Sequence, residues 1–319
     1  MEAFPRRLLT TAIANMEKIK QHCIESFKTQ PGDALALGII DFEKKEFKSF
    51  QIEKNKHQVI ESSEKIFFDL ASLTKPLTNS CGAFSNPEKL NTDMSLLLNH
   101  KSSLPAWGLL GKTTWKEQLL SYEIKKAETE YSDFGALRFM LEFNKTGETL
   151  HKVAKKIWDE EVVFWTDLTV DHRTVQNGFV NGRPNFLNVH DPNAFNIKAE
   201  TSHAGLFGTV EGVCKTLLNF DQNLDLLNKM NNELSNEHDR FVLGWDTVSD
   251  AQNTLAGNGC GERVFGHLGF TGTSIWIDPV KKLGHVLLSN TTKLNWYDKQ
   301  ELNKLRKSLG RFIWEGSPL

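Results

Sequence analysis

A serine and a lysine three residues apart, Ser72 and Lys75, are the side chains of this sequence best suited to covalent chemistry. A serine hydroxyl is a weak nucleophile until a base takes its proton, and a lysine can be that base when its environment holds it neutral. A spacing of three places both side chains on one face of a helix. The apolar residues 66–68 and Pro76 predict a buried helix start, where the Ser72 amide is an unpaired donor available to an oxyanion.

A second pair with the same spacing, Ser62 and Lys65, lies ten residues earlier in the polar stretch E-S-S-E-K. Because this stretch has no apolar context, we expect a solvated turn there. The alternative for Ser72 itself is a helix cap with Lys75 exposed at the surface. The pair alone leaves both interpretations open.

Two further segments carry polar residues at the start of a helix and on a strand. Tyr131 opens Y-S-D-F-G-A-L, where Ser132 or Asp133 can cap a following helix and Tyr131 can be a packing residue. The stretch H-L-G-F-T-G-T-S at 267–274 contains more glycine than is usual for a strand. Glycine weakens a strand, but it is tolerable where a ligand or another backbone approaches closely. A further H-x-G at 203–205 shows that this three-residue pattern alone does not identify a functional site.

The bulk composition excludes several classes of function. With 319 residues the chain exceeds the usual size of a single core, so we expect two lobes. Hydrophobic residues at 39% and charged residues at 24% are typical of a soluble globular protein. The formal charge is −2 and no dense Lys/Arg block occurs, so neither nucleic acid nor a membrane is an expected partner. We expect a small-molecule substrate and favour a monomer.

The cysteines, histidines and N-terminal residues indicate a cytoplasmic protein without a metal or other cofactor. The four cysteines are widely spaced without a C-x-x-C pair, and the histidines lack metal spacing. His190, Asp191 and His203 are expected to stabilise long loops. Residues 1–20 read as an amphipathic helix, because polar residues interrupt the apolar run before a signal-peptide core forms, and no run has the length of a membrane span.

Periodicity predicts one antiparallel, five-stranded sheet flanked by terminal helices. The strands are expected at 34–40, 47–52, 264–270, 273–277 and 284–289, and the terminal helices at 8–27 and 297–314. The predicted sheet lobe comprises 1–70 and 245–319. A helical, loop-rich lobe is predicted over 71–244, with helices at 115–120, 134–143, 150–158 and 210–220. The long irregular segment 177–203 is typical of a loop that lines a cleft, and we expect the active site between the lobes.

The order Ser-x-x-Lys, Tyr-x-acid, His-x-Gly resembles the serine β-lactamase and penicillin-binding protein superfamily, most closely the class C-like serine hydrolases and esterases. The likeness extends over about residues 31–290. It includes the blocks F-D-L-A-S-L-T-K-P-L-T, L-L-N-H-K-S-S-L-P-A-W, V-H-D-P-N-A-F, H-A-G-L-F-G-T and F-G-H-L-G-F-T-G-T-S-I-W-I-D-P. The resemblance implies an α+β fold of the β-lactamase/transpeptidase-like type.

The resemblance also implies roles for individual residues. Ser72 would be the acylated nucleophile and Lys75 its base, sharing protons with Tyr131. His267 would orient a substrate carboxylate or tune this proton network. The backbone amides of Ser72 and Phe270 would form the oxyanion hole. The residues expected to contact substrate are Asp133, Gly269, Thr271 and Trp107, the last on the rim of the cleft.

Three departures from the family pattern affect the function. The segment between Lys75 and His100 is short, Ser103 stands where glycine is usual, and Asp133 replaces an asparagine. We therefore expect a serine hydrolase that acts through a Ser72 acyl-enzyme on a small ester, amide or lactam. One alternative is a D-Ala peptidase or endopeptidase on peptidoglycan. The other is a non-catalytic ligand-binding protein of the same fold, and the short segment between Lys75 and His100 favours this second alternative.

Overall fold

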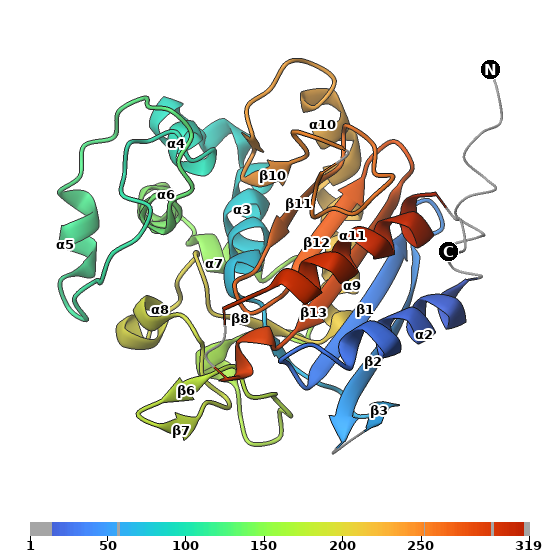
Figure 1. Ribbon diagram of the computed structural model, residues 1–319. Helices are drawn as coiled ribbons and strands as arrows, with labels where there is room; N and C mark the ends of the chain where they lie inside the picture. Colours follow the sequence, from blue (N-terminus) through green and yellow to red (C-terminus); the bar gives the residue numbers. More distant parts are fainter. Residues whose placement is uncertain (1–14, 56–57, 252, 295–296, 316–319) are drawn as a thin grey trace, which may run out of the picture.

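The computed structural model describes residues 15–55, 58–251, 253–294 and 297–315, and its main feature is an antiparallel sheet of eight strands (Figure 1). The strands lie in the order β3-β2-β1-β13-β12-β11-β10-β9. Their bounds are β1 Ala34–Asp41, β2 Glu46–Asn55, β3 Gln58–Glu61, β9 Phe241–Val242, β10 Trp245–Thr247, β11 Phe265–Leu268, β12 Ser274–Asp278 and β13 Leu283–Ser289.

The predicted five-strand count is wrong, although all five predicted strands are present. The additional strands β3, β9 and β10 lie at the two edges of the sheet and contain two to four residues each. Segments this short show too few alternations to be recognised from a hydrophobic pattern. The predicted core of the sheet, from β2 through β11, is therefore correct and its edges are not.

Helices cover both faces of the sheet. Helices α2 (Met16–Phe27) and α11 (Gln300–Trp314) share one hydrophobic cluster with β1, to which β1 contributes Leu35 and Leu37. Ala36 and Ile40, on the opposite face of β1, join the cluster that contains α9 (Val210–Leu224). Because both faces are covered, β1 is buried along its whole length. The part of the first predicted helix before residue 15 lies outside the described residues.

Close contact between α9 and the sheet depends on a glycine in β1. A Cβ atom on Gly38 would lie 2.4 Å from the Cys214 sulfur of α9, closer than real Cβ contacts. Cys214 and the other three cysteines are buried free thiols. Gly38 thus allows the helix to approach the sheet.

The remaining helices lie mostly beside the sheet. They are α3 Cys81–Ser85, α4 Thr92–Leu98, α5 Trp115–Leu120, α6 Asp133–Asn144, α7 Leu150–Ala154, α8 Pro192–Ile197 and α10 Leu226–Glu233, with short 3₁₀ turns at Pro87–Lys89, Trp165–Asp167 and Thr291–Leu294. A small sheet joins β4 (Phe68–Asp69), β8 (Leu206–Gly208) and β5 (Val162–Phe164), and β6 (Phe179–Val180) pairs with β7 (Arg183–Pro184). Within the described ranges, no helix is long and apolar enough to cross a bilayer.

A separate hydrophobic cluster joins α4, α5 and α6 through residues such as Leu97, Leu119 and Phe139. The division into two lobes, with boundaries at residues 71 and 244, stays a prediction. Two elements inside that range, α9 and β9, lie with the sheet.

The loop after α4 contains a backbone conformation that favours glycine. Ser103 is exposed and has φ +56°, in the left-handed region that costs an ordinary residue about 1–2 kcal/mol. We expect Ser103→Gly to raise the free energy of unfolding by about 1 kcal/mol, since glycine relieves the strain at some cost in chain entropy. Urea denaturation measures this change. The control Ser121→Gly, at φ −73°, should not be stabilising, and a Ser103→Gly protein no more stable than the parent would contradict the prediction.

Candidate active site

The Ser72 segment is a helical stretch that begins directly after β4. Ala71–Leu73 forms a 3₁₀ turn, Pro76–Ser80 widens into a π turn, and α3 continues the same stretch. Pro76 has no N–H, so it cannot complete an ordinary helical turn with the preceding residues. Ala71, just before the serine, has φ +48°, a strained conformation of the kind that often accompanies functional sites. The predicted helix start at Ser72 is therefore confirmed.

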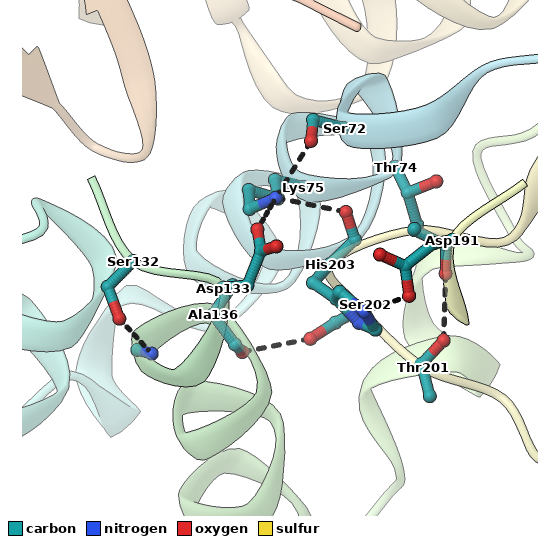
Figure 2. A network of polar contacts seen from close by, with 12 residues as sticks. Ser72, Thr74, Lys75, Ser132, Asp133, Ala136, Asp191, Thr201, Ser202 and His203 are labelled. Atoms are coloured by element: carbon teal, nitrogen blue, oxygen red, sulfur yellow. Dashed lines mark hydrogen bonds and ion pairs between the residues drawn. The ribbon is translucent and has the colours of Figure 1, made fainter. Parts of the chain in front are cut away.

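Lys75 is buried beneath Ser72 and is surrounded by three oxygen atoms. Its Nζ lies 3.0 Å from Ser72 Oγ, 2.6 Å from Asp133 Oδ1 and 3.0 Å from the carbonyl oxygen of His203. Figure 2 shows the Lys75 side chain reaching these three groups, which come from three separate segments of the chain. An ammonium group has three N–H bonds, so each one has an acceptor here.

These contacts determine the charge of Lys75 in the resting protein. Burial lowers the pKa of Lys75, but the neighbouring Asp133 carboxylate and the Tyr131 phenol oppose that effect and hold the pKa above its ordinary value. The ammonium is thus the resting form, so the environment does not hold Lys75 neutral in this state. Lys75 can accept the Ser72 proton only while it passes a proton of its own onward.

Tyr131 and His267 lie on the other side of Lys75. The Tyr131 ring centroid is 4.8 Å from Lys75 Nζ and 5.8 Å from the His267 ring centroid. Burial raises the pKa of Tyr131, so its phenol is protonated at neutral pH. Burial, together with the charge of Lys75, lowers the pKa of His267 to about 3, so this imidazole is neutral at neutral pH. A neutral His267 cannot form an ion pair with a substrate carboxylate, but it can take part in a proton network.

Hydroxyl groups tie the turn after β11 to the backbone that precedes Ser72. The Thr271 hydroxyl donates to the Asp69 carbonyl at 2.7 Å, and the Thr273 hydroxyl donates to the Leu70 carbonyl at 3.1 Å. A Cβ atom on Gly269 would lie 2.7 Å from the Leu70 carbonyl, so glycine is required for this approach. These contacts hold the Phe270 segment beside the Ser72 segment, as the predicted oxyanion hole requires.

The Thr271 side chain forms a hydrogen bond within the protein. Its hydroxyl hydrogen is donated to Asp69, and the residue is only 1% exposed. The hydroxyl therefore has no hydrogen left to donate to a substrate. We assign Thr271 a positioning role in the turn that carries Phe270.

Asp69 joins the nucleophile segment to the long loop at 177–203. Its carboxylate accepts from the amides of Ala71 at 2.9 Å and His190 at 2.6 Å, and from the Asn177 side chain at 2.9 Å. Burial raises the pKa of Asp69 to about 7. This residue is a positioning group that the sequence analysis missed. An acidic residue inside the apolar run before Ser72 was the available signal.

Two cavities meet at Ser72, Tyr131 and Phe270. One, of about 290 Å³, is also lined by His267 and by basic side chains; we call it the cationic cavity. The other, of about 450 Å³, is lined by two carboxylates and several aromatic rings; we call it the acidic cavity. The further residues of the cationic cavity include Arg240, Asp246, Lys299, Asn303 and Arg306, and those of the acidic cavity include Trp107, Asp133, His190, Asp191, His203 and Tyr297.

The cationic cavity holds one buried cation, Arg306, and one partly buried cation, Lys299, with which no carboxylate of the described chain forms an ion pair. Arg306 is 2% exposed, and its guanidinium donates to Asn303 at 3.0 Å and to the Thr273 carbonyl at 2.9 Å, while Nε has no partner. Burial, with the charge of Arg306, lowers the pKa of Lys299 to about 8. Arg240, by contrast, forms a two-bond ion pair with Asp246. This cavity therefore retains an excess of positive charge.

The family of the chain follows from a comparison of its sequence with known families. A model of the β-lactamase family matches residues 83–308, which include Tyr131 and His267. The chain belongs to the β-lactamase family. The matched range begins after Lys75. The assignment of Ser72 and Lys75 to the site of this β-lactamase-family protein therefore rests on their geometry and on their position before the matched range.

Two curated relatives align with part of this β-lactamase-family chain. An N-acetylmuramyl-L-alanine amidase of Bacillus subtilis is 32% identical over 136 residues, 39% of this chain and 31% of the relative. A putative D-alanyl-D-alanine carboxypeptidase of Escherichia coli is 36% identical over 113 residues, 32% of this chain and 26% of the relative. The chain thus spans less than a third of the length of these curated relatives.

Solved structures confirm the fold class. A class C β-lactamase from Rhodobacter sphaeroides superposes with a TM-score of 0.61 at 14% identity, covering 93% of this chain and 97% of that one. A β-lactamase from Mycobacterium bovis gives a TM-score of 0.53 at 17% identity, covering 91% and 98%. The predicted α+β, β-lactamase/transpeptidase-like fold is therefore correct.

The structure brings the predicted site residues of this β-lactamase-family protein together around Ser72. Tyr131 and Phe270 line both cavities with Ser72, whereas Lys75 lies beneath the serine. The other predicted residues that line a cavity are Trp107, Asp133, His267 and Gly269. His190, Asp191 and His203, expected to stabilise loops, line the acidic cavity as well, and the cations Arg240, Lys299 and Arg306 were not anticipated.

Proposed function

We propose that this protein is a serine hydrolase that forms an acyl-enzyme on Ser72 with small ester or amide substrates. The observation that carries the proposal is the 3.0 Å contact between Ser72 Oγ and Lys75 Nζ at the point where two cavities meet. The second Ser-x-x-Lys pair offers a contrast. Lys65 is exposed and forms an ion pair with Glu161, so it is not a partner of Ser62.

The arrangement supports a proton relay from the serine to the leaving group. As Ser72 Oγ bonds to the substrate carbonyl carbon, its proton passes to Lys75, which at the same time gives a proton to Tyr131, and Tyr131 protonates the departing oxygen or nitrogen. The bond between the carbonyl carbon and the leaving group then breaks. Water hydrolyses the acyl-enzyme by the reverse proton path, which restores the Ser72 hydroxyl.

Asp133 and the oxyanion hole supply the electrostatics of this reaction. Asp133 stabilises the positive charge that remains on Lys75 throughout the relay, because its carboxylate lies 2.6 Å away. The amides of Ser72 and Phe270 would stabilise negative charge on the carbonyl oxygen, which is usually a large contribution in acyl transfer. Every group in the relay therefore has a charged or hydrogen-bonding partner.

One observation favours a peptidase among the alternatives. The uncompensated cations Arg306 and Lys299 suit a carboxylate, because a buried cation without a partner is costly and a carboxylate accepts its hydrogen bonds. A substrate with a carboxylate on one side of its scissile bond would thus be held against Ser72. The relatives, an amidase and a putative carboxypeptidase, agree with amide hydrolysis.

Steady-state kinetics on esters and a lactam test the proposal. We expect p-nitrophenyl acetate and p-nitrophenyl butyrate to turn over measurably, and a chromogenic cephalosporin to acylate Ser72 but to be hydrolysed poorly. The lactam carboxylate suits the cationic cavity, whereas its bulky acyl side chain must pack beside the carboxylates of Asp133 and Asp191, and release of a bulky acyl group needs a well-held water.

Two outcomes would decide against this account. A kcat/KM for the cephalosporin above that for both esters would show that the protein is a lactamase in preference to an esterase. Tight binding of the cephalosporin without any covalent adduct or ester turnover would instead support the non-catalytic alternative.

A further inference from the structure

The acidic cavity has two carboxylate oxygens that face no cation of the described chain. Asp133 Oδ1 is bound by Lys75, and Asp191 Oδ1 accepts from His203 Nε2 at 2.8 Å and from the Ala194 amide at 2.7 Å. Within the described residues, Oδ2 of each carboxylate has no donor. Lys75 Nζ contacts one of the two carboxylates, and an oxygen of each remains available to a donor on a ligand.

His203 adds a buried ring nitrogen without a partner to the same cavity. The residue is 1% exposed and lines the cavity, and its Nδ1 has no hydrogen-bond partner. Nε2 is engaged by Asp191, so Nδ1 is the ring nitrogen left for a ligand to meet. A buried polar atom without a partner is unusual in a folded protein, and this one lines the cavity in which a ligand can supply the partner.

Aromatic rings form the remaining wall. Trp107, Phe270 and Tyr297 are each about half exposed, and the ring centroids of Phe270 and Tyr297 are 5.3 Å apart. The ring of Phe270 already receives a cation on one side, because Lys299 Nζ lies 4.1 Å from its centroid. Aromatic faces attract cations through their quadrupole. The two carboxylates and the aromatic wall of this cavity therefore favour the same kind of ligand, a positively charged donor.

We propose that the substrate carries an ammonium group which the acidic cavity binds, while its carboxylate is bound in the cationic cavity on the other side of Ser72. The inference rests on the proposed hydrolase function and names its substrate class, a small peptide or peptide-like amide with a free amino terminus. In an unblocked dipeptide the ammonium and the carboxylate flank the scissile amide on opposite sides. The two cavities likewise meet at Ser72, and each extends from it over its own set of residues.

Matched dipeptides test this assignment. Unblocked and N-acetylated dialanine, each in the D,D and L,L forms, are incubated with the protein at pH 7, where most of the free amino group is charged, and released alanine is measured. The expected result is a kcat/KM at least tenfold higher for the unblocked form of one stereoisomer. Equal or faster release from the acetylated form would overturn the proposal, and so would release from neither form.

Variants of the acidic cavity identify the binding residues. Asp191→Asn keeps a side chain that can cap α8, and we expect it to reduce the ratio of kcat/KM for unblocked over acetylated dialanine at least tenfold. Asp171→Asn, at an exposed position outside both cavities, is the control and should leave the ratio unchanged. If Asp191→Asn does not fold, Trp107→Ala should lower the ratio at least threefold. An unchanged ratio in the variant that folds would overturn the proposal.

Failure of the substrate class and failure of the hydrolase function are distinguishable. Labelling of Ser72 by a fluorophosphonate together with ester turnover, but no release from dialanine, would refute the inference and leave the function standing. Absence of labelling and of ester turnover would refute both.

Discussion

Ser72→Ala is expected to abolish covalent labelling by a fluorophosphonate and to lower ester hydrolysis at least about 10⁴-fold. The reason is that Ser72 Oγ is the hydroxyl found next to a buried lysine, at 3.0 Å from its Nζ, at the meeting point of both cavities. Alanine removes the nucleophile and fills nearly the same space, so the fold should persist. Intact-mass measurement of the labelled protein, followed by peptide mapping, gives the result directly.

The matched control for this variant is Ser62→Ala. Ser62 has the same sequence spacing to a lysine, but Lys65 is exposed and is engaged by Glu161. Ser62→Ala should retain full labelling and turnover. An adduct mapped to Ser62, or undiminished labelling of the Ser72→Ala protein, would show that the nucleophile has been assigned wrongly.

Lys75→Ala is expected to reduce acylation almost as much as loss of Ser72. Residues that act as one proton-transfer unit are not additive, so removal of any one of them removes most of the effect. Lys75 is the link between Ser72 and Tyr131, and its cation also balances Asp133. The rate of fluorophosphonate labelling and the kcat/KM for p-nitrophenyl acetate are the two measurements.

A structural side effect of Lys75→Ala can be separated from the chemical one. Loss of the cation leaves the Asp133 carboxylate without a partner in a poorly solvated place, which is strongly destabilising. The double variant Lys75→Ala/Asp133→Asn should regain thermal stability but not activity. Lys65→Ala is the matched control for the chemical effect and should keep the activity of the parent. Near-normal activity in Lys75→Ala would contradict the prediction and would indicate Tyr131 as the base.

The parts of the fold that were predicted from sequence are those with a long, regular pattern. β1 and β13 contain eight and seven residues, all buried, and their apolar runs were recognised nearly to the residue. β9 contains two residues, and its place in the sheet depends on pairing with β10 and not on its own composition. Local pattern thus predicted the centre of the sheet, while its edges are determined by tertiary contacts.

The site, too, has features that could be predicted from sequence and features that depend on tertiary contacts. Ser72 and Lys75 are neighbours on one helical stretch, so their contact could be predicted from spacing alone. The charge of Lys75 could not, because Asp133 approaches from a different helix. Arg306 lies on the last helix and meets the site only through the packing of that helix on the sheet. Residues whose partners are distant in sequence carry no local signal of their role.

The central position of β13 has a consequence for the synthesis of this protein. β1 pairs with β13, and the Ala34 amide donates to Asn290, 256 residues further along the chain. The hairpin of β1 and β2 therefore leaves the ribosome long before its second partner exists, with one edge unpaired and exposed to aggregation. A chain that stopped short of β13 would lose the strand that joins the two halves of the sheet, so the sheet can be completed only after β13 has been synthesised, and its folding is slowed by these non-local contacts.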